Sequence, residues 1–131
     1  MIYLDTSALV KLVVKGLETS ALRRFLAKVE PGMLVTSALT RVELLRVAYR
    51  SGSEPTLRKA REVLDGVGEV TITQSLLDSA GTLAPPTLRA LDAIHLATAL
   101  ELGEELQAFV AYDIRLLSAA QHAKLPTLAP S

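Results

Sequence analysis

The stretch Met1-Ile2-Tyr3-Leu4-Asp5-Thr6-Ser7-Ala8-Leu9-Val10 places a short apolar run directly before an acidic residue and a segment with helical spacing of apolar residues. The stretch Ala108-Phe109-Val110-Ala111-Tyr112-Asp113 and the residues after it follow the same order. Short apolar runs that alternate with longer amphipathic segments are typical of an α/β fold with a mostly parallel sheet. We therefore predict two buried strands, at residues 1–5 and 108–112, with an aspartate and a helix at the end of each.

The rest of the chain continues this alternation. Further strands are expected at the short apolar runs 33–36 and 69–72, and a last one at 127–128. Helices are expected where apolar residues recur at helical spacing between Ser, Pro or Gly residues that mark helix ends. The predicted helices cover residues 7–14, 18–29, 38–50, 54–65, 74–83, 88–102 and 114–120, and Thr87 is expected to cap the helix at 88–102.

Length and composition predict one globular domain at residues 1–131. A chain of 131 residues, 50% of them hydrophobic, can bury a single core, and it contains no linker or repeat that would divide it. With no Trp and an aromatic share of 4%, that core must consist mainly of Leu, Val, Ile and Ala. The 14 basic residues balance the 14 acidic ones, which argues against a protein that coats nucleic acid through net positive charge.

The sequence lacks Cys, which excludes disulfide bonds, zinc–thiolate sites and thiol nucleophiles. No apolar run approaches the roughly 20 residues of a transmembrane helix, so we expect no membrane span. The N-terminus reaches a charge at Asp5 without a preceding basic segment, so we expect no signal peptide. These features fit a cytoplasmic protein.

Two acidic residues follow predicted strands. Asp5 and Asp113 each stand between an apolar strand and a helix. In parallel α/β sheets ligands bind outside the carboxyl ends of the strands, near the point where the strand order reverses, so the two carboxylates could converge in one crevice. The alternative is that each residue is a helix N-cap, a position that Asp favours. The sequence leaves both interpretations open.

Two further acidic residues interrupt the apolar faces of predicted helices. Glu43 has Leu39 and Val47 one turn away on either side, and Asp92 is flanked by leucines in the same way. A buried carboxylate without a partner is costly, so each should meet a cation. That cation is either a metal ion or a nearby basic side chain, which would be Arg46 or Arg50 for Glu43, and Arg89 or His95 for Asp92.

Four such carboxylates in a chain without Cys favour a hard cation. Mg²⁺ and Mn²⁺ prefer oxygen ligands, and an ion bound among clustered carboxylates offsets their mutual repulsion. A metal-bound water is also a better nucleophile, and the ion offsets charge on an attacked phosphate. The sequence therefore predicts a Mg²⁺ or Mn²⁺ site, with one ion or two, at Asp5, Glu43, Asp92 and Asp113.

The stretches that contain these acids resemble the four motif regions of PIN domains, and most closely those of VapC-type toxins of prokaryotic toxin–antitoxin pairs. The resemblance covers essentially the whole chain, in the order and spacing of the family. The four stretches are Tyr3-Leu4-Asp5-Thr6-Ser7-Ala8-Leu9-Val10, Thr40-Arg41-Val42-Glu43-Leu44-Leu45-Arg46, Leu91-Asp92-Ala93-Ile94-His95-Leu96-Ala97-Thr98-Ala99-Leu100 and Tyr112-Asp113-Ile114-Arg115-Leu116.

This resemblance implies a three-layer fold, in which helices flank a mostly parallel sheet of four or five strands. It implies the activity of a Mg²⁺- or Mn²⁺-dependent endoribonuclease with Asp5, Glu43, Asp92 and Asp113 as catalytic residues. Asp5 and Asp92 would be direct metal ligands, and Asp113 a ligand directly or through water. Glu43 would complete the site through water or a second ion.

Two positions depart from the family pattern. Many relatives have Thr or Ser where this chain has Ala111, and some have an acidic residue just after the last Asp, where Arg115 and an apolar residue follow here. The site thus lacks one hydroxyl group that relatives carry. At the other strand end, Thr6 or Ser7 is expected to orient Asp5 by a hydroxyl hydrogen bond, or to act only as a helix cap.

The resemblance also implies three kinds of partner: RNA as substrate, a small VapB-like antitoxin, and a second copy in a homodimer. Antitoxins of this kind place a helix in an apolar groove. For RNA, a group of basic residues around Glu43 is expected to form either a phosphate track or only a solvated helix face. The group comprises Arg41, Arg46, Arg50, Arg58, Lys59 and Arg61.

Two other functions compete with this hypothesis. One is a different metal-dependent nuclease or phosphatase, and the other is a non-catalytic PIN-like binding module. An aspartyl-phosphate mechanism would need a second Asp where Ser7 stands, and the chain has no Gly-rich phosphate loop. The intact set of four acids argues against a binding module.

Overall fold

The computed structural model of the protein covers residues 1–131 and contains one five-stranded sheet in which all paired strands are parallel. The strand order is β3-β2-β1-β4-β5, so β1 lies in the centre. The predicted α/β fold with a parallel sheet of four or five strands is confirmed. The strands are β1 (Ile2–Leu4), β2 (Leu34–Ser37), β3 (Gly68–Val70), β4 (Ala108–Val110) and β5 (Thr127–Leu128).

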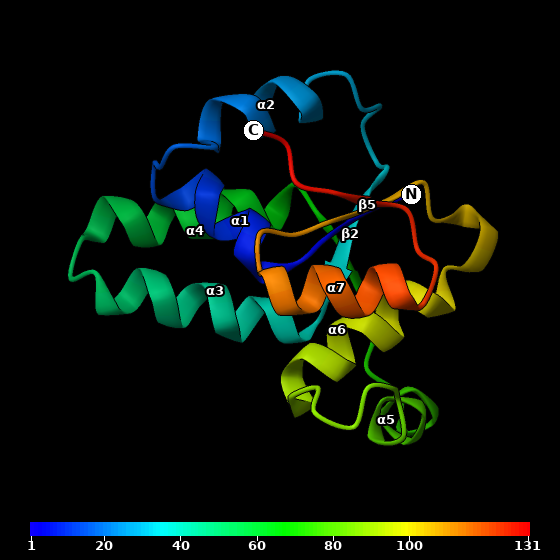
Figure 1. Ribbon diagram of the computed structural model, residues 1–131. Helices are drawn as coiled ribbons and strands as arrows, with labels where there is room; N and C mark the ends of the chain where they lie inside the picture. Colours follow the sequence, from blue (N-terminus) through cyan, green and yellow to red (C-terminus); the bar gives the residue numbers. More distant parts are fainter.

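Helices cover both faces of this sheet (Figure 1). The first four pack on one face, the last two on the other, and α5 packs against α6. None of the helices is long and apolar enough to cross a membrane. The helices are α1 (Thr6–Val13), α2 (Thr19–Leu26), α3 (Leu39–Arg50), α4 (Glu54–Asp65), α5 (Gln74–Gly81), α6 (Ala90–Glu101), the short 3₁₀ helix η1 (Gly103–Glu105) and α7 (Ile114–His122).

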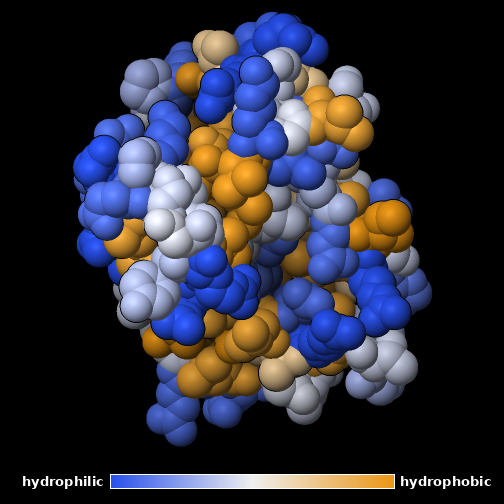
Figure 2. Space-filling view, turned by 90° about the vertical axis from the view of Figure 1, so that its left-hand side faces the viewer, coloured by the Kyte–Doolittle hydropathy of each residue, from blue (hydrophilic) through white to orange (hydrophobic).

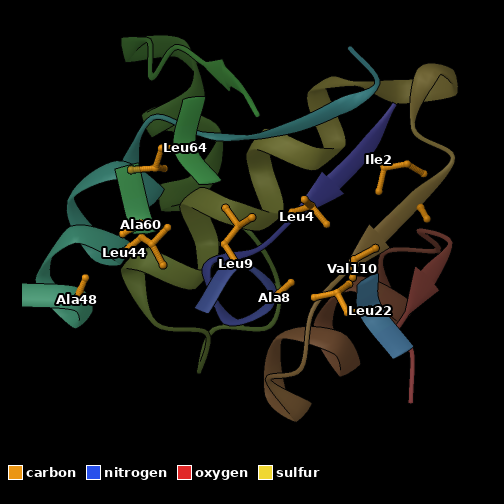
Figure 3. Packing of buried hydrophobic residues seen from close by; sticks show 11 residues of the cluster. Ile2, Leu4, Ala8, Leu9, Leu22, Leu44, Ala48, Ala60, Leu64 and Val110 are labelled. Atoms are coloured by element: carbon orange, nitrogen blue, oxygen red, sulfur yellow. The ribbon is translucent and has the colours of Figure 1, made fainter. Parts of the chain in front are cut away.

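The two central strands are buried on both faces because their alternate residues enter different cores. In β1, Leu4 joins the cluster formed with the first four helices, whereas Tyr3 joins the cluster formed with α6 and α7. Figure 3 shows Leu9 of α1 close to Leu44 of α3 and Ala60 of α4 in the first of these clusters. Continuous apolar runs are typical of such doubly covered parallel strands, which explains the opening stretch of the sequence.

Most predicted boundaries agree with the structure to within about two residues, as expected for helix and strand ends. The predicted helix at 18–29 is shorter, because α2 ends at Leu26. Beyond it the N–H groups of Lys28 and Val29 donate to carbonyls three positions back, which tightens the chain into turns.

The helix predicted at 88–102 begins later, and the expected cap at Thr87 is wrong. The N–H of Leu88 donates to the Pro85 carbonyl at 3.0 Å, which closes a turn over the two adjacent prolines. Arg89, the N-cap residue, has an extended backbone with φ −70° and ψ 151°, so the helical conformation starts only after it.

This later start changes the position of Asp92. The residue lies in the first turn of α6 rather than in the middle of a helix, and Leu88 is not its helical neighbour. The N-terminal end of a helix carries a partial positive charge, which stabilises a carboxylate. The site therefore receives Asp92 from a helix end, as it receives Asp5 and Asp113 from strand ends.

The packing of α1 can be tested with a matched pair of substitutions. Leu9 is fully buried in the first core, whereas Leu17 is 99% exposed. We expect Leu9→Ala to lower the free energy of unfolding by about 3–5 kcal/mol, because it leaves a cavity that the neighbours do not refill. Leu17→Ala should change it by less than about 0.5 kcal/mol. Urea titrations followed by circular dichroism measure both, and equal effects would contradict the packing described here.

Candidate functional site

The site lies where the order of the strands reverses. From β1 the chain moves outward through β2 to β3, and then returns to the other side of β1 to form β4. The crevice at the carboxyl ends of β1 and β4 is therefore the switch point at which α/β proteins bind ligands. Asp5 follows β1 directly, and its N–H donates to the Val110 carbonyl of β4 at 2.9 Å.

Asp5 is the most buried of the four acids, with 4% of its surface exposed. Its Oδ2 accepts the N–H of Ser7 at 3.1 Å and the hydroxyl of Ser7 at 2.7 Å, so the predicted capping role is confirmed. Ser7, and not Thr6, orients this carboxylate. The hydroxyl oxygen of Ser7 also accepts the N–H of Tyr112 at 2.9 Å, which ties the end of β1 to the end of β4.

Asp113, which is exposed, also caps its helix with only one of its two carboxylate oxygens. Its Oδ1 accepts the N–H groups of Arg115 at 2.9 Å and Leu116 at 3.1 Å and caps α7. The hydrogen bonds of Asp5 likewise involve only Oδ2. Each aspartate thus caps its helix with one oxygen, while the other oxygen accepts no hydrogen bond from the chain. The two interpretations of these residues, cap and ligand, are compatible.

Glu43 is held by uncharged and histidine partners rather than by arginine. Its Oε1 accepts the Thr6 hydroxyl at 2.6 Å and lies 2.7 Å from Nε2 of His95. The other ring nitrogen of His95 lies 2.7 Å from the hydroxyl of Tyr3 and 3.5 Å from Oδ1 of Asp5. The buried imidazole therefore connects the central strand, Asp5 and Glu43.

The expected pairing of Glu43 with arginine is wrong. Arg46 lies over the ring of Tyr49, 5.6 Å from its centroid, and Arg50 forms no ion pair. The Glu43 carboxylate is instead engaged by Thr6 of α1 and His95 of α6, while both arginines are exposed.

The partners of Glu43 determine its charge. Partial burial raises its pKa, but the hydrogen bonds from His95 and Thr6 outweigh this effect and hold the pKa below its usual value. For His95 burial lowers the pKa, and the hydrogen bond to Glu43 together with the charges of Asp5 and Glu43 outweighs it, so that the pKa is raised. The pair therefore favours a carboxylate beside an imidazolium.

Asp92 differs from the other acids because it has no ion-pair partner. The expected pairs with Arg89 or His95 are wrong, since the imidazole is engaged by Glu43 and Asp5. Partial burial raises the pKa of Asp92, and the negative charges of Asp113, Asp5 and Glu43 raise it further, against a smaller lowering by His95. The four predicted acids thus share one electrostatic environment, in which Asp92 experiences the charge of the other three.

The donor set suits a hard cation, although the side chains do not form a ready-made metal group. No three Asp, Glu or His side chains of the chain converge closely enough to hold an ion as they stand. Carboxylate oxygens are the ligands that Mg²⁺ and Mn²⁺ prefer. Partial burial and the charges of the neighbouring acids raise the pKa of Asp92, and a bound cation would offset those charges.

Two threonines to which the sequence analysis gave no role, Thr36 and Thr40, form hydrogen bonds next to the acids. The hydroxyl of Thr36 donates to the Leu4 carbonyl at 2.7 Å and lies 2.7 Å from the hydroxyl of Thr40, which in turn lies 3.2 Å from that of Thr6. Every buried side-chain polar atom of the chain has a hydrogen-bond partner. Thr36 and Thr40 are spaced by four positions, a spacing that places them together where β2 passes into α3. This spacing was the only signal in the sequence.

The sequence and the fold of the chain match one family. The sequence model of the PIN-domain family matches residues 2–122 of the chain. Ribonuclease VapC47 of Mycobacterium tuberculosis is 45% identical over 99% of this chain and 97% of its own length, and ribonuclease VapC46 of the same species is 43% identical over 99% and 98%. The chain therefore belongs to the PIN-domain family, among the VapC ribonucleases.

Solved structures confirm the fold of this family. The crystal structure of Mycobacterium tuberculosis VapC20, described as a sarcin–ricin loop cleaving toxin, superposes with a TM-score of 0.76 at 20% identity, over 99% of this chain and 100% of the other. A toxin–antitoxin complex from Klebsiella pneumoniae contains a chain with a TM-score of 0.75 at 20% identity, over 100% of this chain and 98% of that one. The three-layer PIN-like architecture predicted from the sequence is confirmed.

The pair formed by His95 and Glu43 predicts a pH-dependent stability in the metal-free protein. Because the pKa of His95 is raised from 6.5 on folding, its contribution is fully present below pH 6.5 and is lost as the pH rises through the folded value. The pKa of Glu43 is lowered from 4.5, so its contribution is present above pH 4.5 and is lost as the pH falls through the folded value. We expect the pair to stabilise the fold most between these two limits.

Urea unfolding in EDTA at a series of pH values measures this effect. The stability advantage of the wild type over His95→Gln should shrink as the pH rises above 6.5. His122→Gln is the matched control, because His122 is exposed near the end of α7. An advantage over His95→Gln that stays constant with pH would show that folding does not raise the pKa of His95.

Proposed function

We propose that the chain is a cytoplasmic, Mg²⁺- or Mn²⁺-dependent endoribonuclease that acts as the toxin of a toxin–antitoxin pair. It would hydrolyse RNA phosphodiester bonds at the site of Asp5, Glu43, Asp92 and Asp113. The observation that carries this proposal is the shared electrostatic environment of the four acids at the switch point of the sheet. The relatives that are 43–45% identical over nearly the whole chain are named ribonucleases, which supports RNA as the substrate.

In this proposal Asp5, Asp92 and Asp113 hold the metal ion. Asp5 and Asp113 each keep one carboxylate oxygen apart from their capping bonds, and Asp92 has no competing cation. When bound, the ion would offset charge on the attacked phosphate and make a bound water a better nucleophile. The ion would also favour the ionised form of Asp92, whose pKa is raised by partial burial and by the charges of Asp113, Asp5 and Glu43.

Glu43 would complete the site without being a direct ligand. Its Oε1 is occupied by Thr6 and His95, which keep the carboxylate ionised and fix its direction. The second oxygen accepts no hydrogen bond from the chain and can accept one from a water molecule at the site. His95 and Tyr3 support this position from the core, because both are almost completely buried.

Replacing Asp5 tests the proposed activity. We expect Asp5→Asn to lower the rate of RNA cleavage in Mg²⁺ or Mn²⁺ by about 100-fold or more, since even supporting groups around catalytic metals contribute up to that amount. The amide can still accept the bonds from Ser7, so the fold should persist in circular dichroism. EDTA should abolish cleavage by the wild type. Denaturing gels of labelled RNA measure the rates.

Asp65→Asn is the matched control for this substitution. Asp65 is exposed at the end of α4, outside the site, and its loss should leave cleavage unchanged. Single-stranded DNA and nucleoside monophosphates run beside RNA decide between a ribonuclease and another metal-dependent nuclease or phosphatase. RNA cleavage that survives both EDTA and Asp5→Asn would refute the proposal.

The toxin role requires a partner, and the surface of the chain offers apolar area for one. Figure 2 shows hydrophobic residues gathered between hydrophilic ones on the side where the α3–α4 hairpin ends. Val14, Leu17 and Tyr49 are among the large apolar residues that are exposed on the chain. Exposed apolar area of this kind is typical of interaction surfaces. A VapB-like antitoxin and a second copy of the chain are the proposed partners.

Growth of a bacterial host tests the toxin role directly. Expression of the wild-type chain alone should stop growth, and expression of Asp5→Asn should not, because the effect depends on RNA cleavage. Coexpression with the protein encoded by the adjacent reading frame should restore growth and yield a complex on size-exclusion chromatography. Growth arrest by Asp5→Asn at the same expression level would show that toxicity does not come from the acidic site.

A further inference from the structure

A cleft adjoins the acidic site on the side of α7. It has a volume of about 570 Å³ and lies between the turn at residues 85–89 and α7, with Asp92 at one end. A shallower depression of about 400 Å³ contains Asp92 and Asp113 together. Arg89, Ile114 and Arg115 line both hollows, so that the cleft and the acidic site form one continuous surface.

Two cations stand where the cleft meets the acids. Arg89 and Arg115 are exposed, and neither forms an ion pair or a side-chain hydrogen bond within the chain. By contrast, Arg41 of the basic group in α3 is paired with Glu69 at 2.7 Å. Unpaired guanidinium groups beside a carboxylate site favour binding of an anion. Each phosphodiester of a nucleic-acid backbone carries a negative charge and two non-bridging oxygens that one guanidinium group can bind together.

The walls of the cleft combine apolar contact with free hydroxyl groups. Leu88 and Ile114 supply apolar surface, and Ile114 is 82% exposed although it directly follows Asp113. Thr87 and Ser118 are exposed, and their hydroxyl groups form no hydrogen bond within the chain. An unpaired nucleobase needs such a surface, with apolar contact for its face and polar groups for its edges.

We propose that this cleft binds an unpaired nucleotide next to the scissile phosphate of a single-stranded RNA. Arg89 and Arg115 contact the backbone phosphates on either side of the cleft mouth, while Leu88 and Ile114 contact the base. The volume of about 570 Å³ lies within the range of small-ligand sites. This inference rests on the proposed ribonuclease function and adds where the RNA lies and which residues contact the base.

The position of the cleft also revises the path expected for RNA. The sequence left open whether the basic residues of α3 and α4 form a phosphate track or only a solvated face, and those helices form a hairpin that extends away from α7 (Figure 1). Arg50 lies at the end of α3, at the tip of this hairpin. The cations that border the acids are instead Arg89 and Arg115, which precede α6 and begin α7.

Binding of a fluorescein-labelled, mixed-sequence single-stranded RNA to the Asp5→Asn protein in Mg²⁺ tests the proposal without requiring cleavage. Arg89→Gln and Arg115→Gln in this background should each weaken binding about threefold to tenfold and reduce the slope of log affinity against log salt by about 0.7, the value for one lost single-strand phosphate contact. Ser118→Leu, which narrows the cleft, should weaken binding without changing the slope. Arg50→Gln is the matched control and should change neither quantity. Circular dichroism verifies that all variants are folded.

The outcomes separate this inference from the proposed function. Wild-type affinity and slope in both cleft variants, an equal loss in Arg50→Gln, or no RNA binding by the Asp5→Asn protein would each overturn the cleft as the RNA site. If the cleft variants lose binding while the wild type cleaves no RNA in Mg²⁺ or Mn²⁺, the cleft assignment holds and the ribonuclease proposal fails.

Discussion

The parallel pairing of β1 with β4 is the contact on which the rest of the site depends. Leu4 pairs with Val110, and the N–H of Asp5 donates to the Val110 carbonyl, so both strands end at the same level. The hydroxyl of Ser7 then bonds the Asp5 carboxylate and accepts the N–H of Tyr112, which precedes the second aspartate. A shift of this register by one residue would turn alternate side chains of β1 into the wrong layer and separate the two strand ends.

Concentrating negative charge at one sheet edge carries an electrostatic cost, and the fold distributes that cost unevenly. Asp5 receives hydrogen bonds from Ser7, and Glu43 receives them from Thr6 and His95, so both are stabilised as anions within the chain. Asp92 receives no such hydrogen bonds, and partial burial together with the charges of the other acids raises its pKa. The negative charge that the chain does not compensate is therefore that of Asp92, beside the cleft. A metal ion and an RNA bound there together would offset each other's charge.

The sequence predicted the features that depend on local order and missed those that depend on long-range packing. Strand–aspartate–helix order was enough to predict Asp5 and Asp113 at one edge of a parallel sheet. The roles of cap and ligand looked like alternatives in the sequence, whereas the structure shows that a carboxylate with two oxygens can serve both. The pairing of His95 with Glu43 spans 52 positions and arises only from the tertiary packing that brings α3 and α6 together. Asp92 lies in the first turn of α6 because a turn at Pro85–Leu88 delays the start of that helix. The periodicity of apolar residues does not reveal such a turn.

The central claim is that the four acids act as one cation site, and the pKa of Asp92 reports on it most directly. Carboxyl ¹³C chemical shifts followed through a pH titration give this pKa with and without Mg²⁺. We predict a raised pKa in the metal-free protein, caused by burial and by the charges of Asp113, Asp5 and Glu43, and a clear decrease when Mg²⁺ is added. A pKa of Asp92 that Mg²⁺ leaves unchanged, at concentrations that support cleavage, would contradict the account.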